Sequence, residues 1–330
     1  MLVLVTGGAG YVGAHTVRVL LRAGYEVVVL DSFEHGHRAA LPDGQLVDVV
    51  EGRVGNAALL HWLFRRYRVD AVLHFAGYIE APRSVREPEV FYRNNVGEGM
   101  ALLQAMLDAG VRHLIFSSTA AVYGDPVEVP IREDHPLQPV NPYGWSKLFF
   151  ERMLADLRTA HGLQSVSLRY FNAAGADPGG EIGEAHPNET HLIPRVLAVA
   201  LGKADRFTVY GTDYPTTDGT CERDYVHVVD LARAHLLALE ALLRGSARPA
   251  YNVGVGARHS VRQVVQVCRE VTGHPIPVQE LDRRPGDPAR LEADATLIQR
   301  DLGWRPELSD LRTIVASAWA WHRAHPDGYR

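Results

Sequence analysis

Residues 2–13 read LVLVTGGAGYVG, an apolar run of strand length that passes directly into a glycine-rich turn. Gly8, Gly10 and Gly13 fit the pattern G-x-G-x-x-G, and Gly7, Gly10 and Gly13 also recur at every third position. Glycine is needed where the backbone turns tightly against a pyrophosphate. The start of the following helix then offers free N–H groups and a positive dipole end to that anion. The glycines alone could mark only a tight turn, but their place between a strand and a helix favours a dinucleotide site.

The first half of the chain continues this alternation of apolar strand-length runs and longer amphipathic segments, which is typical of a parallel sheet. The predicted strands are Leu2–Val5, Val27–Leu30, Val47–Val50, Ala71–Phe75, Leu114–Ser117 and Val166–Leu168. The predicted helices are Val12–Ala23, Ala57–Tyr67, Glu89–Ala109 and Pro142–Thr159. The predicted fold class is therefore α/β, a Rossmann-type doubly wound parallel sheet with a smaller C-terminal substrate-binding α/β region.

The sequence changes in character after Asn172, where Gly, Pro and Asp gather in predicted loops at 176–188, 211–219 and 283–288. Short predicted helices at 192–201, 229–243, 261–272 and 311–322 separate them. A chain of 330 residues suits one large domain with a lesser partner. We predict a Rossmann domain at 1–172 plus about 224–245, and a substrate-binding region at 173–223 and 246–330.

The composition excludes several classes of protein. The formal net charge is −5, and no run of like charge suggests binding to nucleic acid or to a membrane surface. No apolar run approaches the ~18 residues of a membrane span. The two cysteines, Cys221 and Cys268, lie far apart, which argues against a disulfide scaffold and fits a reducing compartment. We predict a cytoplasmic protein.

Asp31 ends the second predicted strand, at the distance from the glycine turn that a dinucleotide site requires. In that position its carboxylate accepts hydrogen bonds from the ribose hydroxyls of adenosine, and its charge repels a 2′-phosphate. This favours NAD over NADP as the cofactor. The alternative is that Asp31 only caps the turn that follows it.

Tyr143 and Lys147 form a Y-x-x-x-K pair on a helix that Asn141 and Pro142 are suited to begin. Residues four apart share one helix face, so both side chains can enter one cleft. The ammonium of Lys147 and a cationic nicotinamide would lower the pKa of the phenol from ~10 by favouring its phenolate form. Tyr143 could then take a proton from a sugar hydroxyl that Thr119, at the end of a predicted strand, also contacts.

Other chemical motifs are weak. His35 and His37 are close in sequence, but neither an HExxH motif nor a Cys/His cluster accompanies them, so we predict no metal site. A G-x-S-x-G nucleophile turn and a Walker A sequence are also absent from the sequence.

Together these motifs resemble the extended short-chain dehydrogenase/reductase family. The resemblance rests on Gly7–Gly13, Asp31, Phe75–Gly77, Ser118-Thr119, Tyr143 with Lys147, and Arg169–Asn172. Later motifs are similar to those of family members that act on UDP-hexoses, and they extend the resemblance as far as Trp304. These motifs are Tyr123–Asp125, Gly211–Gly219, Arg223–Val228 and Arg283–Asp287.

The resemblance implies an NAD-dependent isomerase that interconverts UDP-glucose and UDP-galactose at C4 through a transient 4-keto sugar, as in galactose metabolism. It implies catalytic roles for Tyr143, Lys147 and Thr119, and a homodimer with 89–109 and the Tyr143 helix at its interface. The implied cofactor contacts are Gly7, Gly10, Tyr11, Val12, Gly13, Asp31, Val54, Phe75, Ala76, Gly77, Asn94, Ser117, Tyr143, Lys147 and Tyr170. The implied contacts to the UDP-sugar are Ser118, Thr119, Tyr143, Asn172, His191, Leu192, Tyr210, Arg223, Arg284 and Asp287.

The sequence departs from the family pattern in four places. Arg53 stands where the best-known members have an Asp that meets the adenine amino group, and Ile79 replaces a lysine that touches the cofactor. His191 stands at the position of a substrate-contacting Asn. Leu291 stands where some members have a bulky Tyr, and a smaller side chain there could admit an N-acetyl group at C2.

Alternative functions remain open at this point. One is an epimerase of another nucleotide sugar, either a UDP-N-acetylhexosamine or a UDP-uronic acid whose carboxylate Arg83 or Arg195 could meet. A 4,6-dehydratase is disfavoured because Ala120 and Ala121 follow Thr119, where an acid–base pair is expected. A non-catalytic NAD sensor on the same fold would not need Thr119, Tyr143 and Lys147 together.

Overall fold

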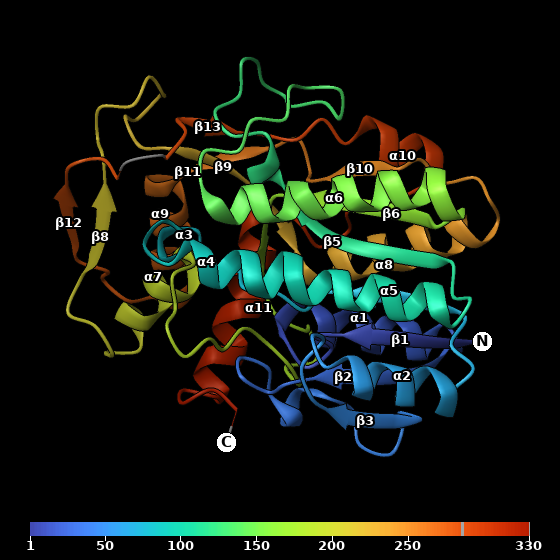
Figure 1. Cartoon of the computed structure of the whole chain (residues 1–330). Coiled ribbons are helices and arrows are strands. Elements are labelled where there is room, and N and C mark those ends of the chain that lie inside the picture. Colours follow the sequence, from blue (N-terminus) through green and yellow to red (C-terminus); the bar gives the residue numbers. More distant parts are fainter. Residues whose placement is uncertain (285–286, 330) are drawn as a thin grey trace.

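The computed structural model describes residues 1–284 and 287–329. Figure 1 shows a large sheet sandwiched between helices, with a smaller group of helices and short strands beside it. Among the described residues, seven strands form the large sheet in the order β10-β6-β5-β4-β1-β2-β3, and every neighbouring pair is parallel. These strands are β1 (Leu2–Thr6), β2 (Glu26–Asp31), β3 (Asp48–Glu51), β4 (Ala71–His74), β5 (His113–Thr119), β6 (Gln164–Tyr170) and β10 (Ala250–Val253).

The strand order reverses between β1 and β4, and ligands of open parallel sheets bind in the crevice at such a switch point. The predicted fold class is confirmed: the sheet is doubly wound and Rossmann-like, with a smaller α/β region attached.

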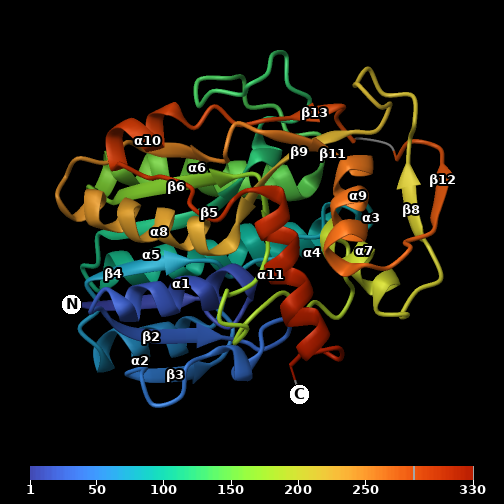
Figure 2. The ribbon, with the colours of Figure 1, turned by 180° about the vertical axis from the view of Figure 1, so that it is seen from behind.

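Each face of the large sheet is covered by its own helices, as the two views in Figures 1 and 2 show. On β1, Val3 and Val5 point into one core, and Leu4 points into the other, because successive side chains of a strand alternate in direction. The first core lies under α1 (Tyr11–Arg22) and α8 (Val228–Leu243). The second lies under α2 (Ala57–Arg66), α5 (Gly99–Asp108) and α6 (Pro142–His161).

The predicted helix 89–109 is present but irregular. The chain forms α4 (Pro88–Phe91), then a π-helical segment η2 (Tyr92–Glu98), and then α5. The wider turn presents two consecutive amides to the loop after β4, where Tyr78 N donates to Asn94 Oδ1 (3.1 Å) and to Asn95 Oδ1 (2.8 Å). Such π segments are frequent at functional sites. A further short helix, α3 (Ala81–Arg86), lies in a stretch where none was predicted.

The smaller region contains α7 (Leu192–Ala200), α9 (Val261–Thr272) and α11 (Leu311–Ala324) around their own apolar core. Its short strands pair over long sequence distances. β9 (Glu222–His227) lies between β11 (Arg258–Ser260) and β13 (Arg290–Leu291) and also pairs with β7 (Asn172–Ala174). β8 (Phe207–Tyr210) pairs with β12 (Val278–Leu281). The remaining elements are η1 (Arg38–Ala40), η3 (Ala120–Val122) and α10 (Thr296–Leu302).

The structure differs from the predicted division of the chain after residue 245. β10 is the edge strand of the large sheet, and its Tyr251 pairs in register with Leu168 of β6. Ile298 of α10 and the nearby Trp304 are buried in the same core as α8. These segments were assigned to the smaller region because they follow a loop-rich stretch, but they complete the large one. In the described part of the chain, no helix combines the length and the apolar character that a bilayer span requires.

Candidate active site

The glycine turn after β1 packs too closely for any side chain. A Cβ at Gly7 would lie 2.5 Å from the amide N of Ala76, and a Cβ at Gly13 would lie 2.2 Å from the carbonyl O of Gly7. Helix α1 begins directly after Gly10, and none of the described side chains caps its first turn. The first N–H groups of the helix and its positive dipole end therefore face the adjoining cavity, as a bound pyrophosphate requires.

A cavity of about 360 Å³ opens at the carboxyl ends of the parallel strands, at the switch point between β1 and β4. It extends from Asp31, at the end of β2, and Val54, after β3, to Thr119 at the end of β5 and Tyr143 on α6. All predicted cofactor contacts line this one cavity: Gly7, Gly10, Tyr11, Val12, Gly13, Asp31, Val54, Phe75, Ala76, Gly77, Asn94, Ser117, Tyr143, Lys147 and Tyr170. The uncapped helix start and the glycine cradle fit a dinucleotide.

Asp31 combines the two roles that the sequence left open. Its Oδ2 accepts from Ala9 N (2.9 Å) and its Oδ1 accepts from Phe33 N (2.8 Å), so the carboxylate does hold the turns around it. It also lines the cavity. Burial raises the pKa of Asp31, and the two backbone N–H groups act in the opposite direction. A carboxylate fixed in this way is preorganised to accept further hydrogen bonds from a ligand hydroxyl.

Helix α6 carries the predicted acid–base pair. It begins as expected, with Pro142 in its first turn and Asn141 Oδ1 accepting from Gly144 N at 2.9 Å. One turn apart, Tyr143 and Lys147 face the cavity, and Thr119 at the end of β5 lines the same cavity. Lys147 Nζ donates to the carbonyl O of Ser117 (2.9 Å). The structure thus brings the three predicted catalytic side chains together.

The electrostatics of this pair differ from the sequence-based expectation. Burial raises the pKa of Tyr143 well above 10, with a further contribution from Tyr170, and the neighbouring Thr119 hydroxyl only partly offsets this. Burial also lowers the pKa of Lys147 to about 8. The sequence predicted that the lysine charge would lower the pKa of Tyr143. The ammonium of Lys147 instead donates to the Ser117 carbonyl, and desolvation disfavours its charged form.

A second cavity, of about 170 Å³, lies in the smaller region and shares lining residues with the first. Asn172 and His191 belong to both cavities, so the two adjoin. Arg284 Cζ lies 4.2 Å from the ring centroid of Tyr210. Arg223 Nη2 lies 3.6 Å from Asp287 Oδ1. Two guanidinium groups at one cavity suit a diphosphate, whose oxygens match their planar array of donors.

Residues 3–254 match the NAD-dependent epimerase/dehydratase family. The chain belongs to this family. The predicted family, the predicted fold class and the predicted dependence on NAD are therefore confirmed.

Relatives within the family match along the whole chain. The chain is 50% identical over 329 residues to the UDP-glucose 4-epimerase of Halalkalibacterium halodurans, with coverage of 100% of this chain and 98% of the relative. A structure of UDP-glucose 4-epimerase from Brucella ovis in complex with NAD is 47% identical, with a TM-score of 0.93 and coverage of 96% and 97%. Another, from Bifidobacterium longum in complex with NAD⁺ and UDP, is 39% identical, with a TM-score of 0.94 and coverage of 100% of both chains.

The predicted substrate contacts, with one exception, line one of the two cavities. These residues are Thr119, Tyr143, Asn172, His191, Leu192, Tyr210, Arg223, Arg284 and Asp287. The exception is Ser118, which is buried and donates to Glu151 Oε1 (2.5 Å). Glu151 also pairs with Arg169 (2.6 Å), so Ser118 belongs to a structural ion-pair network under the site. Strand direction explains the correction, because Ser117 and Thr119 point to one face of β5 and Ser118 points to the other.

The departures from the family pattern have different structural settings. Ile79 is exposed at the rim of the first cavity. Arg53 lines the same cavity and forms ion pairs with Glu34 and Glu98. Leu291 lies on β13 in register with Arg223, and it packs against the apolar cluster that contains Tyr123 and Phe171.

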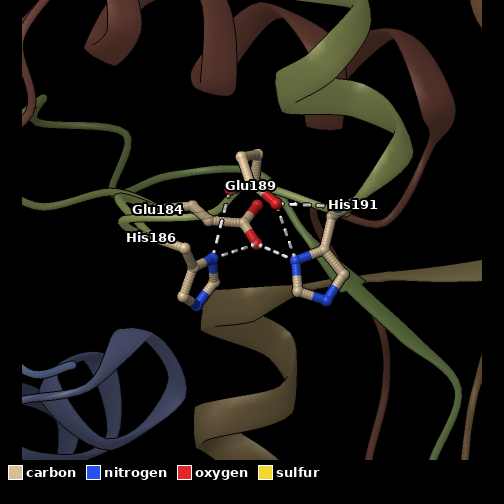
Figure 3. Close-up of side chains that lie close together, drawn as sticks. All are labelled: Glu184, His186, Glu189 and His191. Carbon is tan, nitrogen blue, oxygen red and sulfur yellow. Dashed lines mark hydrogen bonds and ion pairs between the residues drawn. The ribbon is translucent and has the colours of Figure 1, made fainter. Parts of the chain in front are cut away.

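Sequence reasoning missed a group of acidic and imidazole side chains in the 184–191 segment, shown in Figure 3. His191 Nδ1 lies 2.7 Å from Glu184 Oε1 and 3.1 Å from Glu189 Oε1. His186 Nδ1 lies 3.1 Å from Glu189 Oε2. The predicted loop at 176–188 covers Glu184 and His186, and of the four residues only His191 was predicted at the site, so neither periodicity nor a motif signalled that the group converges.

The charges of this group compensate one another. Burial alone would lower the pKa of His191, but Glu184 and Glu189 outweigh it and hold this pKa well above 6.5. The same balance raises the pKa of His186, and the two imidazoles lower the pKa of Glu189 despite its burial. Four such ligand atoms within 4.8 Å could hold a metal ion. The carboxylates favour the charged forms of His186 and His191, which would compete with a cation for the same oxygens, and the absence of a metal site stays a prediction.

Proposed function

We propose that the protein is an NAD-dependent isomerase that interconverts UDP-glucose and UDP-galactose by epimerisation at C4. The observation that carries the proposal is the position of Tyr143, Thr119 and Lys147. They line the first cavity, which adjoins, through Asn172 and His191, a second cavity that carries Arg223 and Arg284. The names of the full-length relatives support the same activity. A non-catalytic sensor would not require an acid–base pair in this cavity.

NAD is expected to lie with its pyrophosphate against Gly7–Gly13 and its ribose beside Asp31. When bound, NAD supplies the hydride acceptor and a cationic ring whose charge favours the phenolate form of Tyr143. Tyr143 Oη takes the proton of the sugar 4-hydroxyl and later returns it. Thr119 donates to the same substrate oxygen and holds it in line. Lys147, anchored at Ser117, binds the nicotinamide ribose and orients the base.

The second cavity is expected to hold the UDP group. Arg223 and Arg284 face its diphosphate, and Asn172 and Asp287 hold the remaining polar atoms. Tyr210 lies beside the uracil, and Leu192 and His191 close the wall toward the sugar. A firm hold on UDP leaves the hexose free to turn and present either face of its C4 carbon to the nicotinamide.

We further propose that two chains form a homodimer through the 89–109 segment and α6. Exposed apolar side chains gather there: Met100 on α5, and Trp145 and Phe149 on α6. The ring of Phe149 lies 5.6 Å from that of Trp145 and 5.9 Å from that of Tyr92 on η2. An apolar patch of this kind suits an interface with a second copy.

The two unpaired cysteines, both buried, agree with a place in the cytoplasm.

The test is to incubate the purified protein with UDP-galactose, with no added NAD, and to follow UDP-glucose by chromatography. We expect product without net NADH, because each hydride taken up is returned. A parallel reaction with UDP-N-acetylgalactosamine examines whether Leu291 leaves room at C2. No product from UDP-galactose, even after NAD is added, would contradict the proposal and direct attention to UDP-uronic acids.

A further inference from the structure

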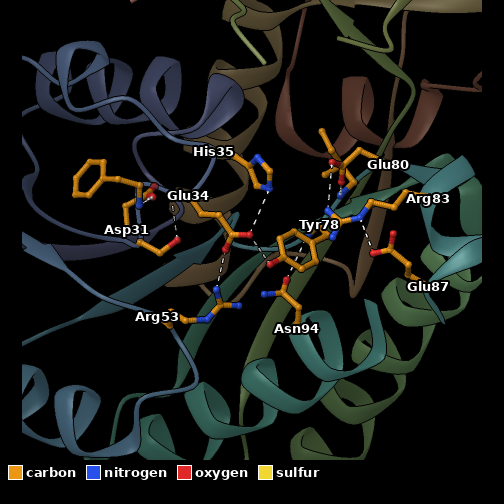
Figure 4. A network of polar contacts seen from close by, with 12 residues as sticks. Asp31, Glu34, His35, Arg53, Tyr78, Glu80, Arg83, Glu87 and Asn94 are labelled. Atoms are coloured by element: carbon orange, nitrogen blue, oxygen red, sulfur yellow. Dashed lines mark hydrogen bonds and ion pairs between the residues drawn. The ribbon is translucent and has the colours of Figure 1, made fainter. Parts of the chain in front are cut away.

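Arg53 is the centre of an ion-pair network that spans four separate segments at the mouth of the first cavity. Its Nη1 donates to Glu34 Oε2 (2.7 Å), in the loop after β2. Its Nε and Nη2 donate to Glu98 Oε1 (3.0 and 2.8 Å), at the end of η2. Tyr78, after β4, donates its hydroxyl to Glu34 Oε1 (2.7 Å). Figure 4 shows Glu34 held between Arg53 and Tyr78.

This network is built into the backbone around it. Gly55 N donates to Glu98 Oε2 (3.1 Å), and a Cβ at Gly55 would lie 2.6 Å from the Glu98 side chain, so glycine is needed for this approach. The backbone N–H of Tyr78 is held by Asn94 and Asn95 of the π segment. The four side chains are therefore fixed from both sides of the crevice.

All four side chains line the first cavity. They follow β2, β3 and β4, beside Asp31 and Val54, which is the side of a Rossmann crevice that takes the adenosine half of a dinucleotide. The chain thus places a cation at this end but surrounds it with two carboxylates. An arginine neutralised in this way is not available to a 2′-phosphate, and it joins the walls of the crevice.

We propose that Glu34, Arg53, Tyr78 and Glu98 form a clamp that closes the adenosine end of the crevice and keeps NAD bound through successive turnovers. Retention matters because the hydride removed from one sugar must return to that sugar, and this part of the argument rests on the proposed function. The closing contacts themselves require only that NAD binds. None of the four residues touches the reacting atoms, so they act as positioning residues.

The strength of the clamp comes from its connections. The side chains of Arg53, Glu34 and Glu98 are 46%, 40% and 19% exposed, and a single pair of this kind contributes little. Here one guanidinium joins both walls, and NAD cannot leave until several contacts break together. Salt screens exposed charges, so the rate of NAD release should rise with ionic strength while the clamp is intact.

The experiment measures NAD release from the holoprotein without any sugar, by exchange against excess isotopically labelled NAD. The test variant is Arg53→Met, which keeps an unbranched apolar stem and removes the charged guanidinium. The matched control is Arg38→Met, which breaks an exposed ion pair with Glu51 (3.0 Å), near the same strands but outside the cavity. We expect release about tenfold faster for Arg53→Met, and within about twofold of the parent for Arg38→Met.

Salt gives a second measure. Raising the salt concentration should speed NAD release from the parent protein and from Arg38→Met, but not from Arg53→Met, which has no clamp left to screen. Tyr78→Phe and Glu98→Gln, which change few atoms, should show intermediate rates and serve if Arg53→Met folds poorly. Equal release rates and equal salt dependence in all of these variants would overturn the clamp.

A final arm connects retention to turnover. Arg53→Met diluted into UDP-galactose should lose epimerase activity as NAD escapes, and added NAD should restore it. If the parent does not epimerise UDP-galactose at all, the proposed function fails, while the exchange rates still decide the clamp. If activity on dilution equals that of the parent without added NAD, the clamp fails and the proposed function stands.

Discussion

The two cavities that adjoin at Asn172 and His191 are built in different ways. The cofactor side is made largely from backbone, with a glycine turn in which a Cβ would approach to 2.2 Å, an uncapped helix start and the ends of long parallel strands. The substrate side is made from side chains such as Arg223, Arg284 and His191, carried on short strands and loops that pair across long sequence distances. A backbone site fixes shape and tolerates almost no substitution. A side-chain site fixes charge, and it can be altered one contact at a time.

The largest effect is expected at the predicted acid–base residue. Tyr143→Phe should lower kcat by about 10²- to 10⁴-fold, because it removes the proton acceptor while the ring still fills its place. NAD content, measured after denaturing the purified protein, should stay equal to that of the parent. Tyr25→Phe, a substitution away from the cavities, is the control. Loss of NAD together with activity would mean that Tyr143 serves the cofactor side rather than the chemistry.

The glycine turn on the cofactor side should be destabilised by a single added methyl group. Gly13→Ala places a Cβ against the Gly7 carbonyl, so the turn must open, at a cost of about 2–4 kcal/mol in the free energy of unfolding. Thermal unfolding with and without NAD measures this. Gly10→Ala is the comparison, since its Cβ would make only an ordinary contact at 3.4 Å. If the two variants unfold alike without NAD, close packing does not explain the glycine at position 13.

Substitution of a side chain on the substrate side should instead raise KM. Arg223→Met removes a guanidinium from the second cavity, and we expect KM for UDP-galactose to rise about 10- to 100-fold with little change in NAD affinity. Arg290→Met is the matched control, because Arg290 lies on the neighbouring strand and pairs with Glu222 (3.2 Å) outside that cavity. Steady-state kinetics with NAD in excess separates the two. A similar rise in KM for Arg290→Met would indicate general disturbance of β9 and β13.

The smallest effect concerns the charge of Lys147 in the NAD-free protein. Its folded pKa, lowered to about 8, lies below the unfolded value near 10.5. Between these values the unfolded chain binds more protons at this site. The contribution of Lys147 to stability therefore rises with pH across that window, by up to about 1 kcal/mol per pH unit. Denaturant unfolding from pH 8 to 9.5 should show this slope in the parent and a smaller one in Lys147→Met. An unchanged difference between the two proteins across this range would contradict the shift.

The contrast between the two sides also explains what the sequence could predict. The glycine turn, Asp31, and the Tyr143–Lys147 spacing are local patterns whose physical requirements lie within a few residues, and the structure places all of them in the first cavity. Ser118 was misassigned because the pattern marks the end of a strand without saying which side chain points to which face. Alternation along β5 settles that question in favour of Ser117 and Thr119.

Other features depend on contacts that no local pattern records. β10 joins the large sheet through β6, which lies some eighty residues earlier in the chain. The Glu184–His191 group depends on how one loop folds back on itself. The raised pKa of Tyr143 depends on its burial, which the sequence does not give. Arg53 could be seen as a departure from the family pattern, but its acidic partners could be found only in space.

The position of α8 has a consequence for how the protein is made. The six strands β1–β6 are complete once Tyr170 has been synthesised, yet the core face under α8 needs Leu231, Ala234 and Leu239. At typical translation rates, the ribosome takes about 4 to 15 s to add the segment between them. During that interval the growing chain carries an apolar sheet face that no later helix has covered. Chaperones can bind the uncovered sheet face during this interval, and a fragment ending near residue 172 would keep that face uncovered permanently.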